Sequence, residues 1–541
     1  MKNKLLFPAV LVLLLSILLI NSCKKEDDIT STPMGQDWTA VDQGAQWTDA
    51  VRNSYYTQDQ GTRTIPYSWL TSLNDISGQA FLYDNLQRYG FLPIPGRKLP
   101  VGFALGRDTA NILSAGMTCS ACHTREIRIG DEKFRIDGAP AFVNTEAFTK
   151  DLEGALIATV SDQVKLEHFI DRIISASAAN GDPAMNDRNA LRSKVVKYQQ
   201  DLTLFNQLSL PATNMWGVGR TDALNQIFNR VAGIDIAPNP DSMITSNIVP
   251  ANSPVRFPFL WNMHLQDYTQ WGGTSVNGNS NQALLRNTAE CLGVGLQFRP
   301  VPNPSMPDGF DYLAVNTIDF NGLIAIEDQV KKIGPPKWPW SLDNGLVTQG
   351  ANLFASNCAS CHGISPGEPR PPSSITWATP VQDVGTDNWY FQTLSRTSSS
   401  GVLSPLLSPV VPTAVISKLV SQNILKQYDP SIAIITPTNS PGPGKYESRV
   451  LEGIWAAAPY LHNGSVPTLE DLLKPASQRP TTFFVGVNYD TLKVGMSIVQ
   501  PLRVGYEYNT TNVGNSNAGH EYGTQFSPQD RAALLEYLKS L

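Results

Sequence analysis

Cysteine and histidine are scarce in this chain of 541 residues, which has six of each. Basic residues are in slight deficit, since 41 Lys and Arg stand against 47 Asp and Glu, a formal net charge of −6. This balance excludes the broad basic face that nucleic-acid binding requires, so we expect no nucleic-acid partner. Hydrophobic residues make up 41% and charged residues 16% of the chain, which is typical of a globular protein and not of a disordered one.

Long apolar runs are missing beyond the first 22 residues, so we expect no membrane-spanning segment there. At the start, two lysines precede an apolar stretch over 5–20, the pattern of an export signal. A transmembrane anchor is the alternative, but the stretch is short of the ~20 residues that a spanning helix needs. Because Cys23 follows as in a bacterial lipobox, we predict a lipoprotein signal peptide over 1–22, a lipidated Cys23 and a flexible tether over 23–44. The mature protein is then expected in the periplasm or at the cell surface, anchored to the outer membrane by lipid only.

Four of the other five cysteines share one pattern, C-x-x-C-H, in which a histidine follows the second cysteine. The two copies are Cys119, Cys122 and His123, and Cys358, Cys361 and His362. This is the attachment signature of c-type haem: two thiols one helical turn apart bond the vinyl groups, and the histidine is the proximal iron ligand. A zinc ribbon would need the copies closer together, and a thioredoxin-like site would need a surrounding βαβ unit. We therefore predict two covalent c-type haems.

The pattern of elements indicates a mainly α protein with two cytochrome c-type haem domains, extensive irregular loops and little β structure, because strand-like alternation is scarce. Residues 333–341 are too rich in proline for a helix or a central strand, so we predict a Pro/Trp-rich linker there. It separates an N-terminal haem domain over 45–332 from a C-terminal cytochrome c domain over 342–541. In the second domain, a helix before the haem motif is expected to cross a C-terminal helix capped by Ser527.

Several stretches outside the haem motifs carry a resemblance to a known family. They are 60–69, 99–103, 136–141, 458–469 and 514–521. Together they resemble the bacterial di-haem cytochrome c peroxidase superfamily, which includes MauG-like enzymes, and most closely its rubber-oxygenase (RoxA)-like branch. The resemblance implies a haem enzyme that reduces hydrogen peroxide with electrons from a small exported cytochrome c or cupredoxin. It also leaves open a dioxygenase that cleaves C=C bonds with O2, or a non-catalytic di-haem electron carrier.

The same resemblance implies roles for single residues. The family places a Trp between the haems, then a Gln and a Glu beside the open face of the first haem, and Trp271, Gln282 and Glu290 match that order. Glu290 would move the proton as general acid/base, Gln282 would hydrogen-bond the bound oxygen, and Trp271 would relay electrons. Trp261 and Trp216 are the alternatives for the bridge. Without the resemblance, Gln282 and Glu290 would be interpreted as part of a solvated helix face.

The sixth iron ligand distinguishes a catalytic haem from an electron-transfer haem. No histidine occurs between His123 and His168, so we predict that the first haem is five-coordinate and is the reaction site, with His168 on a helix surface. For the second haem the resemblance favours His520 as sixth ligand, and Met496, His462 and several tyrosines of the C-terminal third are the alternatives.

The resemblance further allows one Ca²⁺ between the domains, held by the backbone carbonyls of Ala457 and Pro459. Such ligands leave no side-chain signature in a sequence. Cys291, the remaining cysteine, lies in a hydrophobic run and is predicted to be a buried apolar residue. His264 could reach the haem pocket or serve only in packing.

Overall fold

The computed structural model describes residues 37–184, 187–211, 215–235, 242–273, 275–277, 280–306, 309–370, 374–393, 444–500 and 506–541. Asp37–Leu541 forms one unit. The predicted signal peptide, the predicted lipidation site Cys23 and most of the predicted tether lie outside the described residues. Among the described residues, no helix has both the length and the apolar character that a bilayer crossing would need.

The secondary structure is mixed α/β, so the prediction of a mainly α protein with little β structure is wrong. The described part of the chain is 38% helix and 18% strand, with 14 helices and many small sheets. Hydrophobic alternation in the sequence does not predict these strands, because they are short and many of them bury polar side chains. In β5 (Thr124–Ile129), for example, Thr124, Arg125 and Glu126 are buried in succession, so the alternation of a half-buried strand is absent.

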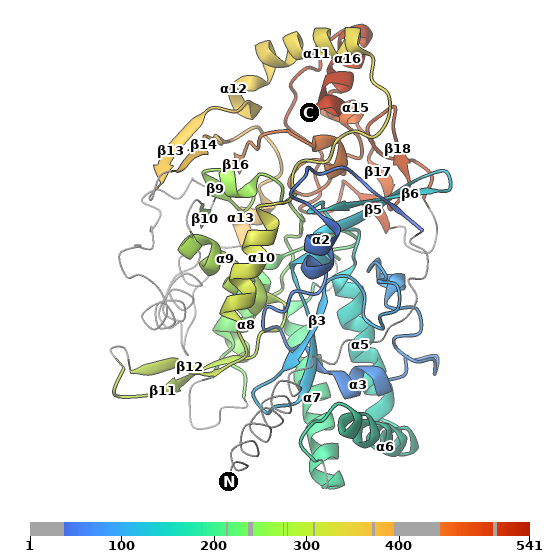
Figure 1. The fold of residues 1–541 in the computed structure, drawn as a ribbon, viewed down its shortest axis with the longest axis vertical. Helices are drawn as coiled ribbons and strands as arrows, with labels where there is room; N and C mark the ends of the chain where they lie inside the picture. The colour runs from blue at the N-terminus through green and yellow to red at the C-terminus, as the bar shows by residue number, and fades with distance from the viewer. Residues whose placement is uncertain are drawn as a thin grey trace, which may run out of the picture. The chain divides into compact units, whose positions relative to one another are not determined.

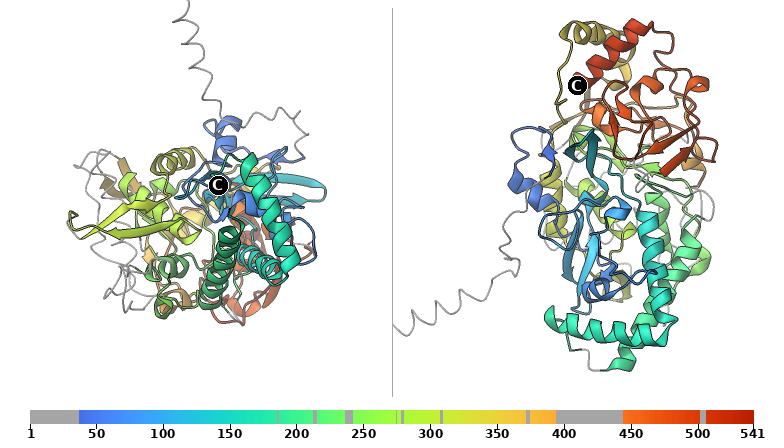
Figure 2. Two further views of the ribbon diagram at one scale, coloured as in Figure 1. Left: turned by 90° about the horizontal axis from the view of Figure 1, so that it is seen from below. Right: turned by 90° about the vertical axis from the view of Figure 1, so that its right-hand side faces the viewer.

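The longest helices follow the first haem motif, and α5, α6 and α7 each begin at an Asn or Asp whose side chain accepts a first-turn N–H. The described helices are α2 (Asp49–Tyr55), α3 (Tyr67–Ser72), α4 (Cys119–Cys122), α5 (Thr145–Val160), α6 (Gln163–Ala179), α7 (Arg188–Ser209), α8 (Ala223–Ala232), α9 (Ser280–Gly293), α10 (Phe320–Val330), α11 (Asn344–Asn357), α12 (Ala359–His362), α13 (Trp389–Thr393), α15 (Leu469–Leu472) and α16 (Pro528–Ser540). Helices α6 and α7 lie toward one end of the unit, and α11 and α16 lie toward the other (Figure 1; Figure 2, right).

The strands form two three-stranded sheets, ordered β2-β4-β3 and β1-β6-β5, and several two-stranded ones. All pairs within named sheets are antiparallel except β1 with β6. The strands are β1 (Thr39–Ala40), β2 (Ile65–Pro66), β3 (Phe103–Arg107), β4 (Leu113–Met117), β5 (Thr124–Ile129), β6 (Glu132–Asp137), β7 (Arg220–Thr221), β8 (Val255–Arg256), β9 (Tyr268–Thr269), β10 (Ser275–Val276), β11 (Phe298–Pro302), β12 (Phe310–Asn316), β13 (Pro366–Arg370), β14 (Ser374–Trp377), β15 (Val381–Gln382), β16 (Tyr446–Glu447), β17 (Thr482–Val485), β18 (Tyr489–Asp490), β19 (Gly495–Met496) and β20 (Tyr506–Asn509). The first haem motif lies between β4 and β5, so one strand of each three-stranded sheet holds it.

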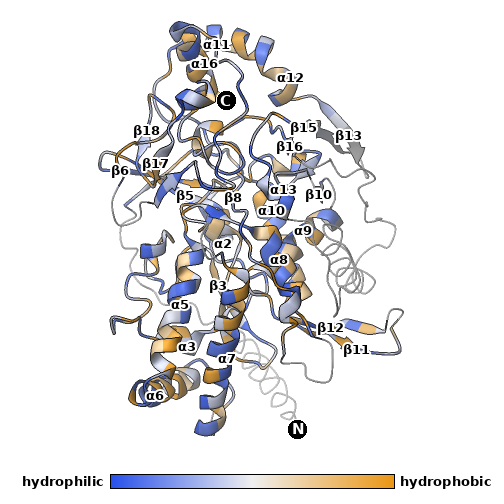
Figure 3. Cartoon of the chain, turned by 180° about the vertical axis from the view of Figure 1, so that it is seen from behind, coloured by the Kyte–Doolittle hydropathy of each residue, from blue (hydrophilic) through white to orange (hydrophobic). Residues whose placement is uncertain are grey.

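Helices α11 and α16 pack directly against each other, which confirms the predicted crossing. Helix α16 begins as predicted, because the Ser527 side chain accepts the Asp530 N–H and a proline occupies the first turn. Both helices carry hydrophobic and hydrophilic residues (Figure 3), and Phe354 of α11 contacts Tyr537 of α16 at a ring-centroid distance of 5.3 Å. Helix α11 leads into the second haem motif, so this pair anchors that motif.

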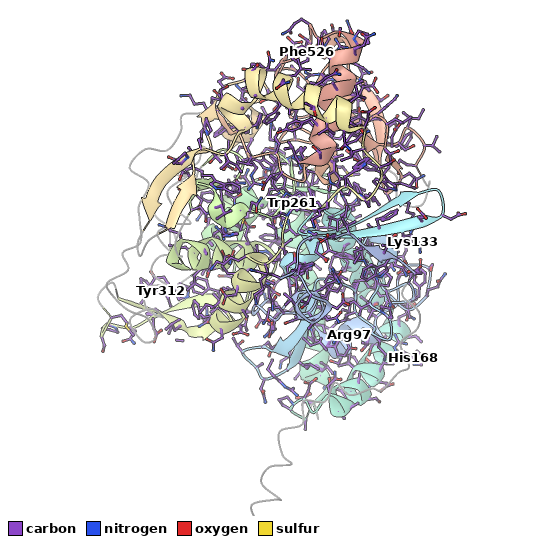
Figure 4. All side chains as sticks on the ribbon, turned by 45° about the horizontal axis from the view of Figure 1, so that its top comes forward. Arg97, Lys133, His168, Trp261, Tyr312 and Phe526 are labelled. Atoms are coloured by element: carbon purple, nitrogen blue, oxygen red, sulfur yellow. The ribbon has the colours of Figure 1, made fainter. Side chains whose placement is uncertain are left out.

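The segment 333–341 contains neither helix nor strand, as its prolines predict. It is packed, however, and not a free spacer: Trp338 and Trp340 meet Trp455 edge-on at 5.3 and 6.1 Å between ring centroids. The Trp455 indole N–H also donates to the Pro336 carbonyl at 2.8 Å. Trp261, labelled near the middle of Figure 4, is buried, and its indole N–H donates to the Glu452 carbonyl at 2.7 Å.

Candidate functional site

A cavity of about 240 Å³, here called the N-terminal cavity, surrounds the first C-x-x-C-H motif. Cys119, Cys122 and His123 line it, together with Trp271 and Glu290. Helix α4 places the two cysteines one turn apart, and the His123 backbone N–H closes the turn on the Cys119 carbonyl at 3.1 Å. This arrangement of two thiols and an adjacent imidazole fits covalent haem attachment.

Gly102, in the stretch 99–103 noted in the sequence, packs against α4. Its φ of +84° favours glycine, and a Cβ there would lie 2.1 Å from the Ala121 backbone nitrogen. The Gly102 carbonyl accepts the Thr118 N–H at 2.8 Å, and the Tyr55 hydroxyl donates to the His123 carbonyl at 3.0 Å. Protein contacts from Gly102 and Tyr55 therefore hold the backbone on both sides of α4.

Among the described residues that line the N-terminal cavity, His123 is the one histidine. Burial lowers the pKa of His123 to about 4, although the nearby Pro258 backbone opposes the shift. The imidazole is therefore neutral at physiological pH, which is the form that ligates iron. Two thioethers, those of Met117 and Met263, also line the cavity.

Glu290 reaches this cavity from α9 and forms a hydrogen bond with a neighbouring loop. The Gln270 side-chain amide donates to Glu290 Oε1 at 2.9 Å. Burial raises the pKa of Glu290, and the Gln270 hydrogen bond and the Arg286 charge partly offset that rise. A carboxyl group with a raised pKa beside a haem motif is suited to hold and deliver a proton.

The other predicted catalytic residues are placed differently. Gln282 is buried in α9 but is not among the described residues that line either haem-motif cavity. Gln270 is the glutamine that contacts Glu290. Of the two alternatives for the tryptophan between the haems, Trp216 lines the N-terminal cavity but not the second haem-motif cavity. Trp261 lines neither cavity in the described part of the chain.

A second cavity of about 220 Å³, the C-terminal cavity, surrounds the second motif. Its lining includes Cys358, Cys361, His362 and His520, and the rings of the two histidines face it with their centroids 6.0 Å apart. The His362 Nδ1 lies 2.7 Å from the Arg449 carbonyl, which directs Nε2 toward the cavity. Burial lowers the pKa of both imidazoles, that of His520 to about 4. Two neutral imidazoles opposed in this way fit the two axial positions of one haem iron.

Met496 and His462, two of the alternatives for the sixth ligand, occupy other positions. Met496 is buried in β19, outside the described lining of the C-terminal cavity. His462 does line the cavity, but its ring stacks on Tyr446 with centroids 3.9 Å apart. His168 is exposed on α6, as predicted (Figure 4), and Cys291 is buried, as predicted.

Trp271 lines both cavities, and so do Arg256 and Arg449. The Trp271 indole N–H donates to the Arg256 carbonyl at 2.8 Å, and the Arg256 guanidinium lies 4.7 Å from the centre of the indole ring. The Trp271 carbonyl in turn accepts the Glu447 N–H at 2.9 Å. An aromatic ring held in this way lies between the two haem motifs.

Sequence reasoning misses Gln270, Arg256 and Arg449. The sequence offers one indication for Gln270, which is its position directly before Trp271. The sequence offers no such indication for the two arginines, because only tertiary packing buries a guanidinium group among backbone carbonyls. Gln60, the first residue of the stretch 60–69, also contacts the motif: its side-chain oxygen accepts from the Cys119 thiol at 3.3 Å.

Comparison with known families finds one match in the C-terminal part of the chain. Residues 444–484 match the family model described as RoxA-like, cytochrome c-like. This segment contains Tyr446, Arg449 and His462, which line the C-terminal cavity. The match supports the RoxA-like cytochrome family and haem c as cofactor, and it indicates a haem-containing oxidoreductase.

Two curated proteins of Sinorhizobium fredii (strain NBRC 101917 / NGR234) are similar to this chain. "Uncharacterized protein y4iJ" is 29% identical over an alignment of 569 positions, gaps included, that covers 92% of this chain and 92% of the relative. "Uncharacterized protein y4iM" is 29% identical over 294 residues, which cover 51% of this chain and 58% of the relative. The first similarity therefore extends well beyond the segment that matches the family model.

Proposed function

We propose that this protein is an exported di-haem c-type oxidoreductase that reduces peroxide at its N-terminal cavity. The first haem would be held by Cys119, Cys122 and His123 and would be five-coordinate. The second would be held by the motif at 358–362, with His520 as its sixth ligand, and would relay electrons. A haem at His123 would supply the metal that takes up and reduces hydrogen peroxide.

One observation carries the proposal: the two cavities differ in what faces the proximal histidine. In the C-terminal cavity His362 and His520 oppose each other with ring centroids 6.0 Å apart. In the N-terminal cavity, as far as it is described, no second histidine is present, and Glu290 with its raised pKa lines the wall instead. Two imidazoles suit a closed redox centre, whereas an imidazole with a nearby proton donor suits chemistry.

Glu290 would hold the proton that peroxide reduction consumes. Reduction of hydrogen peroxide to two waters takes up two protons and two electrons, so a proton source at the reacting oxygen is needed. The protonated carboxyl would donate from the oxygen that is free of Gln270, while Gln270 fixes the other oxygen at 2.9 Å. Gln282 keeps no direct part in this proposal, because its side chain is outside the described cavity lining.

The electrons would enter through the C-terminal cavity and cross by way of Trp271. Support comes from the lining of both cavities by this one tryptophan. Its indole N–H and the face of its ring are both engaged by Arg256, so the ring keeps one orientation. The donor would be a small exported cytochrome c or cupredoxin, and the division into haem domains over 45–332 and 342–541 belongs to the same proposal. So do export and a lipid anchor at Cys23.

Electron paramagnetic resonance of the resting ferric protein tests the asymmetry. We expect one high-spin signal from the first haem and one low-spin signal from the second. His520→Ala should convert the low-spin signal to high spin, because it removes the opposing imidazole. Met496→Leu is the matched control and should leave both signals in place, since Met496 lies away from the cavity. Two low-spin signals in the unmodified protein would overturn the proposal in favour of an electron carrier.

Steady-state peroxide turnover with a reduced cytochrome as donor tests Glu290. Glu290→Gln should lower the rate by about 10²–10⁴-fold, because a carboxamide cannot deliver the proton. Gln282→Asn, on the same helix, should change the rate much less. If the two variants were equally active, the proton would have to come from another group.

A second candidate function is dioxygenase cleavage of a C=C bond in an apolar substrate. Two observations favour it: the match to a RoxA-like model, and the apolar part of the N-terminal cavity wall, which includes Phe148, Leu152, Phe205, Leu210 and Leu260. Consumption of O2 with an unsaturated polyisoprenoid, without any electron donor, would favour this candidate over peroxide reduction.

A further inference from the structure

The backbone carbonyls at residues 456–461 are occupied by two arginine side chains. Arg125 donates from Nη1 to the Ala456 carbonyl at 2.6 Å and from Nη2 to the Ala458 carbonyl. Arg256 donates from Nη1 to the Ala457 carbonyl at 2.9 Å. A further bond runs from Arg256 Nε to the Leu461 carbonyl at 2.8 Å. The segment is thus held by four hydrogen bonds from guanidinium groups.

Both arginines come from the N-terminal half of the chain, whereas the carbonyls belong to the C-terminal half. Arg125 lies in β5, two residues after His123, and Arg256 lies in β8. The contacts therefore span more than 200 residues and tie the surroundings of the first haem motif to the C-terminal cavity. Arg256 also covers the face of Trp271, so the same side chain contacts both the carbonyl segment and the tryptophan between the cavities.

The two guanidinium groups are buried cations without carboxylate partners. Arg125 is 1% exposed and Arg256 is 5% exposed, and neither occurs in an ion pair among the described residues. The guanidinium group of arginine stays protonated in proteins, so both side chains are cations. A charge buried in this way requires compensation, which here comes from the carbonyl dipoles.

The family resemblance leads one to expect Ca²⁺ at this place, on the carbonyls of Ala457 and Pro459. The Ala457 oxygen, however, already accepts from Arg256. Ca²⁺ requires six to eight oxygen ligands, and two guanidinium cations bonded to the carbonyls of Ala456, Ala457 and Ala458 would repel a divalent cation at this place. The residues present do not fit the ion.

We infer that the guanidinium groups of Arg125 and Arg256 replace a divalent cation at residues 456–461, so that this chain joins its two cavities without calcium. Two guanidinium groups carry the charge of one Ca²⁺ and bind the same kind of ligand, the carbonyl oxygen. Unlike a metal ion, they are covalently part of the N-terminal half and cannot dissociate. The junction should therefore be insensitive to chelators.

Metal analysis and thermal unfolding of the full-length, haem-loaded protein test the inference directly. After dialysis against EGTA and then against calcium chloride, we expect no stoichiometric calcium and the same unfolding midpoint in both buffers. Stoichiometric calcium, or a midpoint that rises with calcium and falls with EGTA, would overturn the inference. The measurement is independent of turnover, so it stands whether the enzyme uses peroxide or O2.

Variants test the role of the guanidinium groups themselves. Arg125→Met and Arg256→Met keep the length of the side chain but leave the carbonyls without donors, and each should lower the midpoint by about 5 °C or more. Arg256→Lys, which keeps the charge and one donor, should lose less. Arg97→Met, at an exposed position, is the control and should leave the midpoint unchanged. Unchanged midpoints in both buried variants would also refute the inference, and a variant that fails to fold leaves the calcium measurement decisive.

Discussion

At the scale of single residues, the proposed peroxide chemistry depends on how the groups around Glu290 set the proton affinity of its carboxyl. Burial raises the pKa of this carboxyl, and the hydrogen bond from Gln270 works in the opposite direction because it stabilises the ionised form. The two effects act on the same group from different elements, since Glu290 belongs to α9 and Gln270 to the loop before Trp271. Gln270 is thus a positioning and tuning residue for Glu290.

Gln270→Leu should shift the pH dependence of peroxide turnover to higher pH. Removal of the amide donor destabilises the ionised carboxylate, so the pKa of Glu290 rises further. Because the protonated form delivers the proton, the rate is retained below this pKa and lost as pH rises through it. The measurement is the pH–rate profile of kcat, and a shift toward lower pH would contradict the assignment of Glu290 as the acid.

At the scale of elements, the second haem motif depends on the close approach of α11 and α16. Gly350 of α11 faces the backbone of α16: a Cβ on Gly350 would lie 2.1 Å from the Ala533 carbonyl oxygen and 2.6 Å from the Tyr537 Cβ. Only hydrogen fits between these two helices at that point. The helix that leads into Cys358 is therefore positioned by contact with the C-terminal helix.

Gly350→Ala should destabilise the protein by about 1–3 kcal/mol, because the methyl group overpacks the helix contact. Gly154→Ala is the matched control within a helix, since the nearest atom to its added Cβ is 3.9 Å away. This control should be neutral or slightly stabilising, as alanine favours the helix by up to about 1 kcal/mol. Denaturation followed by circular dichroism measures both, and equal stability of the two variants would show that α11 and α16 can separate without cost.

At the scale of the whole molecule, the junction between the cavities contains a buried carboxyl as well as buried arginines. Glu447 in β16 is 6% exposed, and its Oε2 lies 3.4 Å from Arg449 Nε. Burial raises the pKa of Glu447 to about 7, against the opposing charge of Arg449. Its backbone N–H bonds the Trp271 carbonyl, so the group lies next to the proposed electron route.

The stability of the folded molecule should therefore decline from about pH 5 to about pH 8. The pKa of Glu447 in the folded state is above its ordinary value of 4.5, so its contribution is fully present below that value and is lost as pH rises through about 7. The loss is of the order of 3 kcal/mol. Urea denaturation at several pH values checks this, and Glu447→Gln should weaken the decline. An equally steep decline in the variant would assign it to other groups.

Much of the site was predictable from local sequence because its chemistry is local. Two thiols and an imidazole within five residues predict haem attachment wherever the motif lies, since one turn of helix brings them together. The Ser527 cap of α16 and the packing of α11 against α16 follow from equally short patterns. The β strands could not be predicted from short patterns, because strands such as β5 have polar residues that other elements bury.

The sequence by itself determined where the two C-x-x-C-H motifs lie and that they differ in the histidines available after them. Only the tertiary structure decided that Trp271 lies between two cavities, that Gln270 and not Gln282 contacts Glu290, and that Arg125 and Arg256 occupy the carbonyls of residues 456–461. The physical reason is distance along the chain. The C-x-x-C-H motif consists of residues one helical turn apart, so it is visible in the sequence. A residue that lines two cavities, or a buried cation, depends on contacts between segments hundreds of residues apart, and such contacts produce no periodic pattern in the sequence.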